Sequence, residues 1–267
     1  HPTPYTANVT VSAESDNVYY TVNIVEPDLF DAAAVLEEEK AAMDYMIEEY
    51  KEIDPTMTPA KILSTYYSRG TPSQPFAASG LTPETEYMGY VVTFDPSTGY
   101  PVRVIEFPNL VTTTAVGSVS PTVEWLGCFS GDEEAGTIFG SKSQTQGRAI
   151  AVIKYDNFEG ARKLQTYSVL SDVSNPAEMS DTELWALSIG EWVACKQTSP
   201  YSFYLCDWNQ DMTALAYATD NTGTPGPIGR AWFKATAQDK KPVSELKALY
   251  DLANAKDKSG IAVPSSL

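Results

Sequence analysis

The two halves of this 267-residue chain carry the same helix and turn signals in the same order, and this repetition limits the folds open to it. A hydroxyl residue that can cap a helix is followed by a glycine that can end one, and then by an aspartate that opens a turn. The recurring pairs are Thr58 and Ser180, Gly70 and Gly190, and Asp95 and Asp220, which lie 122, 120 and 125 residues apart. The spacing predicts a tandem duplication, with a single mixed domain as the alternative.

The boundary between the repeats is predicted within residues 111–121 (VTTTAVGSVSP), a small polar segment that contains Gly and Pro. We therefore expect one domain over residues 1–115, a related domain over residues 118–238, and a C-terminal helix and tail over residues 239–267. A chain of 267 residues is long enough for two domains of ordinary size.

The first half mixes strand and helix patterns. The alternation in NVYYTVNIV indicates a strand with one buried face, Thr58 and Pro59 are typical of a helix start, and DPSTG is typical of a hairpin turn. The expected elements are a strand at residues 17–25, helices at 31–53 and 58–69, and hairpin strands at 90–94 and 102–107.

The second half repeats this mixture. Ser180 and Glu183 form an S-x-x-E capping box, and Gly190 would end the helix that the box begins. The expected elements are strands at residues 123–129, 148–155, 191–196, 213–219 and 228–233, and helices at 158–170, 180–190 and 242–256. Two inserted helices are thus expected in each half.

One motif resembles a known family. Residues 81–87 (LTPETEY) match the L-x-P-x-T-x-Y signature of fibronectin type III domains, and YVVTFDPSTG resembles the last hairpin of that family. The resemblance implies a tyrosine corner, in which the hydroxyl of Tyr87 bonds back to the upstream chain. Residues 205–211 (LCDWNQD) of the second half lack the Pro, Thr and Tyr of the motif. The expected fold class is mainly β with helical insertions (α+β): two tandem fibronectin III-like or immunoglobulin-like β-sandwiches plus a C-terminal helix.

In general character the chain is also similar to envelope lipoproteins of Bacteroides-type bacteria, which are tandem, acidic sandwich proteins. That resemblance implies an extracytoplasmic location, either periplasmic or on the cell surface, with a possible lipid anchor upstream of His1. The start without methionine agrees with a removed leader, and no stretch has the ~18 apolar residues of a membrane span.

The residue inventory excludes several functions. The only histidine is His1, and a free terminus is a poor place for a positioned base, so Ser-His-Asp, Cys-His and His-zinc chemistry are not expected. A net charge of −17 argues against nucleic acid as a partner. We expect no enzyme activity and no cofactor. Carboxylates are abundant, and a pair of them remains the one catalytic resource that a hydrolase could use.

Aromatic residues are the best candidates for ligand contact. Tyr201, Tyr204 and Trp208 gather around an expected loop, and amphipathic rings suit the recognition of sugars and peptides. Alternation along SFYLCDW means that half of the side chains face the core. Because its neighbours are polar, Trp208 is expected to be the most exposed ring. Tyr201, Tyr204 and Trp208 are the predicted ligand-binding residues.

The same loop contains a weak cation motif. Asp207, Asn209 and Asp211 alternate as in the first half of an EF-hand loop. Met212 stands where that loop needs Gly, and Ala218 where it needs a bidentate Glu. A polar turn is the simpler interpretation, and no metal site is predicted.

The three cysteines, Cys128, Cys195 and Cys206, all lie in the second half. They are interpreted as small buried residues, and a Cys195–Cys206 bridge between paired strands is the alternative.

These observations favour a non-catalytic extracytoplasmic protein that binds or scaffolds a protein or glycan of a bacterial cell envelope. The alternative function is the binding or cleavage of carbohydrate through exposed aromatics and a carboxylate pair.

Overall fold

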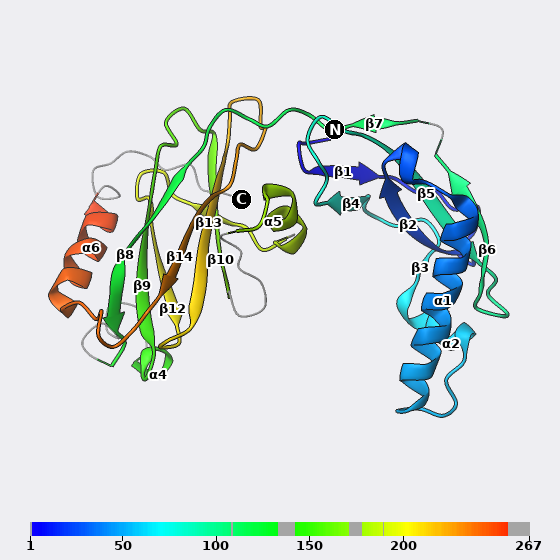
Figure 1. Ribbon diagram of the computed structural model, residues 1–267, viewed down its shortest axis with the longest axis horizontal. Helices are drawn as coiled ribbons and strands as arrows, with labels where there is room; N and C mark the ends of the chain where they lie inside the picture. The colour runs from blue at the N-terminus through cyan, green and yellow to red at the C-terminus, as the bar shows by residue number, and fades with distance from the viewer. Residues whose placement is uncertain (1, 108, 133–141, 171–177, 189, 256–267) are drawn as a thin grey trace. The chain divides into compact units, whose positions relative to one another are not determined.

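The computed structural model describes residues 2–107, 109–132, 142–170, 178–188 and 190–255. The chain divides into two compact units, His1–Ala115 and Val116–Leu267, called unit 1 and unit 2 here. Each unit is built mainly of β-strands, into which a few helices are inserted (Figure 1).

Unit 1 is a sandwich of two sheets. The larger sheet has the strand order β3-β2-β5-β6, with β7 paired to the start of β5, and the smaller consists of β1 and β4. Side chains from both sheets meet between them, among them Val9 of β1, Tyr20 of β2 and Val91 of β5. The strands are β1 (Thr6–Val9), β2 (Tyr19–Val25), β3 (Ser68–Arg69), β4 (Phe76–Ser79), β5 (Glu86–Phe94), β6 (Pro101–Glu106) and β7 (Val111–Thr112).

Two helices, α1 (Ala32–Lys51) and α2 (Pro59–Tyr66), follow β2 and a short 3-10 turn (Pro27–Leu29). Thr58 caps α2, because its side chain accepts a hydrogen bond from the amide of Lys61. Both expected helices of the first half are therefore confirmed.

The buried stripe of each helix explains where it packs. Met43 of α1 and Ile62 of α2 are completely buried against each other. Leu63, the next residue of α2, packs instead against Val92 and Phe94 of β5. The pair of helices thus covers the outer face of the larger sheet.

Unit 2 is also a sandwich of two sheets. The larger has the order β11-β10-β13-β14, and the smaller has the order β12-β9-β8. Between them lies a core of fully buried side chains such as Ile153 of β9, Ala216 of β13 and Phe233 of β14. The strands are β8 (Thr122–Ser130), β9 (Ala149–Asp156), β10 (Lys163–Leu170), β11 (Val193–Cys195), β12 (Tyr201–Cys206), β13 (Asp211–Thr219) and β14 (Gly229–Lys234).

Helices cover both outer faces of this second sandwich (Figure 1). α5 (Asp181–Leu187) packs Trp185 against Tyr217 of the larger sheet, with ring centroids 4.7 Å apart and ring planes tilted by 52°. α6 (Val243–Ala255) buries Leu246 against the smaller sheet. A short helix, α4 (Lys142–Thr145), precedes β9. The capping box at Ser180 and the C-terminal helix are both confirmed.

One expected helix is wrong. Residues 158–170 were predicted to be helical, whereas Lys163–Leu170 forms β10, which pairs with β13 over its whole length. Asn157 and Gly160 adopt positive φ angles of 57° and 79° and turn the chain just before the strand. Within β10, Leu164 and Thr166 are buried two residues apart, which is the period of a strand.

The two units share their strand order. β2, β3, β5 and β6 of unit 1 correspond to β10, β11, β13 and β14 of unit 2, and β1-β4 corresponds to β9-β12. The recurring caps fall on equivalent helices, since α2 precedes β3 and α5 precedes β11. Asp95 and Asp220 likewise follow equivalent strands. Gly70 and Gly190 do not, because Gly70 follows β3 whereas Gly190 precedes β11.

The tyrosine corner is present in unit 1. Tyr87, at the start of β5, is 94% buried, and its hydroxyl oxygen accepts a hydrogen bond of 2.9 Å from the backbone amide of Thr82. This contact and the two-sheet architecture confirm the predicted fold class, tandem β-sandwiches with helical insertions and a C-terminal helix.

Candidate functional site

A cavity of about 290 Å³ lies in unit 2, between β11, β12 and α6. Its aromatic lining comes from Tyr201 and Phe203 of β12 and Tyr250 of α6, while Lys196 and Asn254 add polar groups. Phe203 and Tyr250 contact edge to face, with ring centroids 5.8 Å apart. A cavity that combines rings with hydrogen-bonding groups can hold a small polar molecule or the side chain of a larger one.

The predicted aromatic residues are divided between two environments. Strand alternation places Tyr201 with Phe203 on the α6 side of β12, and Tyr204 on the other side, in the sandwich core. There its hydroxyl shares a 2.9 Å hydrogen bond with the hydroxyl of Tyr155. Burial, and then the neighbouring Tyr204, raise the pKa of Tyr155 strongly. Trp208 is only partly exposed, because its ring packs against the same core. Of the three predicted residues, Tyr201 is the one that lines the cavity.

The acidic loop places its carboxylates in two separate ion pairs. Asp207 accepts a hydrogen bond of 3.0 Å from Nε of Arg148, and Asp211 lies 2.7 Å from Nζ of Lys234. Asn209 adopts a positive φ of 63°, as a turn residue does. Within the described residues, no group of three or more His, Cys, Asp or Glu side chains is placed to hold a metal ion.

All three cysteines are free thiols, so the alternative of a Cys195–Cys206 bridge is not seen. Cys195 borders the cavity, and burial raises the pKa of its thiol to about 11, although a hydrogen bond with Ser202 lowers it somewhat. Burial also raises the pKa of Cys206 to about 11. These thiols stay protonated near neutral pH and are poor nucleophiles.

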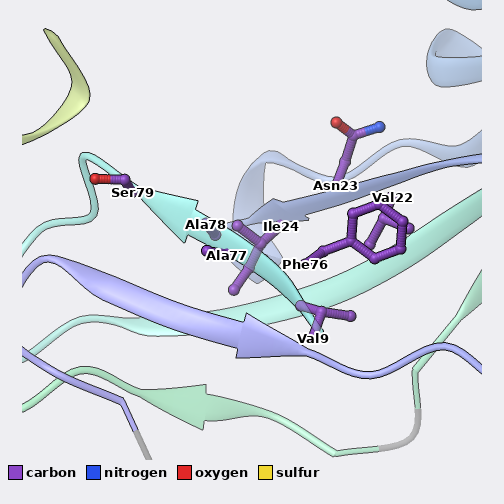
Figure 2. Close-up of a pocket in the computed structure, with 8 residues that line it drawn as sticks. All are labelled: Val9, Val22, Asn23, Ile24, Phe76, Ala77, Ala78 and Ser79. Atoms are coloured by element: carbon purple, nitrogen blue, oxygen red, sulfur yellow. The ribbon is translucent and has the colours of Figure 1, made fainter. Parts of the chain in front are cut away.

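A second cavity, of about 250 Å³, lies in unit 1 (Figure 2). Val22 and Ile24 of β2 face Phe76 of β4 across it, and Val9 of β1 closes one end. The described residues that line this cavity include no charged side chain, and Asn23 and Ser79 add polar groups to its apolar ones.

Sequence reasoning missed most of the unit 2 cavity. Lys196, Tyr250 and Asn254 come from segments far apart in the chain, and only the folded sandwich and α6 bring them together. The one available signal was the apolar stripe of the C-terminal helix, which includes Tyr250 and had to be buried against something.

No protein-family model matches the sequence, and no curated protein is significantly similar to it. Solved structures that show a weak likeness include three with fibronectin type III domains or modules. A two-domain fibronectin type III segment of chicken tenascin is 10% identical and has a TM-score of 0.28, with 88% of this chain and 95% of that chain covered. The FN1–FN3 domains of chicken CNTN1 are 9% identical, with a TM-score of 0.29 and coverages of 88% and 61%. Fibronectin(III)-like modules of CbhA from Clostridium thermocellum are 14% identical, with a TM-score of 0.23 and coverages of 66% and 75%.

TM-scores this low do not establish a shared fold, so the fold assignment rests on the strand order and the tyrosine corner. None of the described helices is long and apolar enough to cross a membrane.

Proposed function

We propose that this protein is a non-catalytic, extracytoplasmic binding or scaffolding protein of a bacterial cell envelope, and that the cavity of unit 2 is its ligand site. The observation that supports this proposal is that one cavity of about 290 Å³ is lined by two aromatic residues and two polar ones, Tyr201, Tyr250, Lys196 and Asn254. Rings provide contact area at a small entropy cost, and the polar groups orient the ligand.

The rings favour a glycan over other ligands, which makes carbohydrate binding the second candidate. A sugar presents apolar C–H faces that stack on Tyr, and hydroxyls that bond to amide and ammonium groups. Cleavage would need two carboxyl groups about 5–10 Å apart. None of the described residues that line the cavity is Asp or Glu, so the site favours holding a sugar over hydrolysing it.

A glycan array tests the ligand site. The wild-type chain is expected to retain at least one glycan, and Tyr201→Ala should weaken it at least about tenfold, because loss of an aromatic anchor typically costs about 2 kcal/mol. Trp232→Ala is the matched control, since Trp232 is half exposed on β14 and is not among the described lining residues. Equal binding by both variants, or no glycan retained by any of them, would exclude carbohydrate as the ligand of this cavity.

The compartment needs a separate test. We propose an envelope location with a lipid anchor upstream of His1, because of the resemblance to tandem sandwich lipoproteins. Fractionation of cells that express the full gene, combined with palmitate labelling, is expected to place the protein in the membrane-associated extracytoplasmic fraction. Recovery in the cytosol without label would refute this location.

A further inference from the structure

One glutamate of α1 faces the sheet instead of the solvent. α1 covers the outer face of the larger sheet of unit 1 (Figure 1). Glu39 lies three residues after Leu36 and four before Met43, so it belongs to the stripe of the helix that packs inward, and it is half-buried. The other glutamates of the helix are all exposed, namely Glu37, Glu38, Glu48 and Glu49. A carboxyl group therefore stands where the helix period calls for an apolar side chain.

Within the described residues, this carboxyl group has one hydrogen-bond donor. The hydroxyl of Thr21, on β2, donates to Oε1 of Glu39 over 2.9 Å. A carboxylate has room for about four donors, and water supplies them when the group is fully exposed. In the half-buried position, one neutral hydroxyl replaces only part of that solvation, so the ionised form is disfavoured.

The titratable groups around Glu39 are neutral or acidic. Burial, and then the charge of Glu39, raise the pKa of Tyr67, the C-cap of α2, to about 12. Burial and Glu39 also raise the pKa of Tyr90 of β5, which shows that the carboxyl group lies near both rings. Glu38 adds a negative charge from α1 itself. Glu106 of β6, which pairs with Tyr90, is also acidic.

No lysine or arginine among the described residues forms an ion pair with this carboxylate. Lys40, the next residue of α1, is exposed. Arg69 of β3 lies over the ring of Tyr19, 5.8 Å from its centroid. Arg103 of β6 points to the opposite face of the sheet from its neighbour Val104, which packs beside the helix. The negative charge of the ionised form is therefore not compensated.

These surroundings make the packing of α1 sensitive to pH. Burial, and to a smaller extent Glu38, raise the pKa of Glu39 above its ordinary value of 4.5, whereas the hydrogen bond from Thr21 lowers it in part. A folded state that holds a proton more tightly is favoured at low pH. The contribution of Glu39 to folding is thus complete below its ordinary pKa and is lost as the pH rises through the raised value.

From these contacts we propose that Glu39 is a pH-sensitive switch for the docking of α1: its neutral form holds the helix on the sheet, and its ionised form loosens the helix. Loosening would uncover Val92 and Phe94 of β5, apolar residues that are at most 4% exposed while the helix is docked. The switch lies in unit 1 and is independent of the cavity proposed as the ligand site of unit 2.

Hydrogen exchange of the full chain, followed by mass spectrometry, tests the switch. Glu39→Gln replaces the carboxyl group by a neutral amide of the same shape that can still accept from Thr21. At about pH 8 the amides of α1 should exchange at least about threefold more slowly in this variant than in the wild type, which then carries the half-buried charge. The ratio of the two rates should fall towards one as the pH is lowered to about 4. Comparing the two proteins at the same pH cancels the intrinsic pH dependence of exchange.

Two further variants separate this charge from other effects. Glu38→Gln is the matched control, because it removes the neighbouring carboxyl group, which is exposed, and it should change the exchange of α1 much less. Thr21→Val removes the hydrogen bond that favours the ionised form, so the carboxyl group of Glu39 should titrate at a higher pH than in the wild type. Carbon-13 NMR of the side-chain carboxyl measures both titrations, and the wild-type midpoint is expected above 4.5.

Several results would overturn the proposal. Exchange that Glu39→Gln slows equally at every pH would show an effect of packing, and unchanged exchange would show no effect at all. An equal response to Glu38→Gln would assign the effect to net charge. A Glu39 midpoint at or below 4.5 would remove the switch itself. Equal slowing in β9 of unit 2 would show that the substitution does not act locally on α1.

Discussion

Replacing Tyr87 by phenylalanine isolates the contribution of the tyrosine corner. The ring stays in its 94% buried position beside Leu81, and only the hydroxyl that accepts the 2.9 Å bond from the amide of Thr82 is removed. A hydrogen bond of this kind contributes about 0.5–1.5 kcal/mol net. Thr82 is exposed, so water can reach its amide in the variant. We therefore expect unit 1 to lose about 1 kcal/mol of unfolding free energy, near the middle of that range.

The distribution of tryptophan makes this loss measurable in the whole chain. All five tryptophans lie in unit 2, at positions 125, 185, 192, 208 and 232. In urea, tryptophan fluorescence therefore follows the unfolding of unit 2, whereas far-UV circular dichroism follows both units. Tyr87→Phe should lower the urea midpoint of the unit 1 part of the dichroism transition and leave the fluorescence transition unchanged.

Tyr45→Phe is the control, because Tyr45 is 64% exposed on α1 and loses a hydroxyl of the same kind. The reasoning would be refuted if Tyr87→Phe changed the unfolding free energy of unit 1 by less than about 0.3 kcal/mol, or by no more than the control does. A loss well above about 3 kcal/mol would also contradict it, because that would require the amide of Thr82 to be sealed from water in the variant.

Two further predictions use the same far-UV dichroism and tryptophan fluorescence transitions, and two concern the buried thiols. Met43→Ala, at a completely buried position, should cost unit 1 about 3 kcal/mol in the dichroism transition. Ser180→Ala removes the capping box of α5 and should cost unit 2 about 1 kcal/mol in the fluorescence transition. The pKa values of the Cys195 and Cys206 thiols are raised to about 11 from an ordinary value of 9.0, so both thiols should react with Ellman's reagent far faster in denaturant than in the native protein at pH 8. Because the folded state holds these protons more tightly, the unfolding free energy of unit 2 should fall as the pH rises from about 9 to about 11, and replacing both cysteines by alanine should flatten that fall.

Local chemistry explains what could be predicted from the sequence. The hairpins β5–β6 and β13–β14 follow from turn residues, with Asp95 and Asp220 each accepting bonds from the amides of the turn that they begin. The helix starts at Thr58 and Ser180 follow from caps that need only three or four neighbouring residues. The tyrosine corner spans six residues. Motifs this short can be recognised from neighbouring residues alone, without any distant partner.

The elements that were missed depend on distant partners. β1 and β4 are strands of only four residues, and β4 (FAAS) is made mostly of small residues that carry no recognisable period. β10 combines apolar residues with polar ones in a spacing that fits a helix or a strand, and only its pairing with β13 decides between them.

The candidate site was harder to predict for the same reason. Tyr201 and Tyr204 are three residues apart in a strand that is covered on both faces, by the sandwich core on one side and by α6 on the other. Aromatic residues on both faces of one strand are close together in the sequence, although their side chains point to opposite faces of the sheet. The sequence does not show that α6 lies on the smaller sheet. It therefore could not distinguish Tyr201, which lines a cavity, from Tyr204, which fills the core.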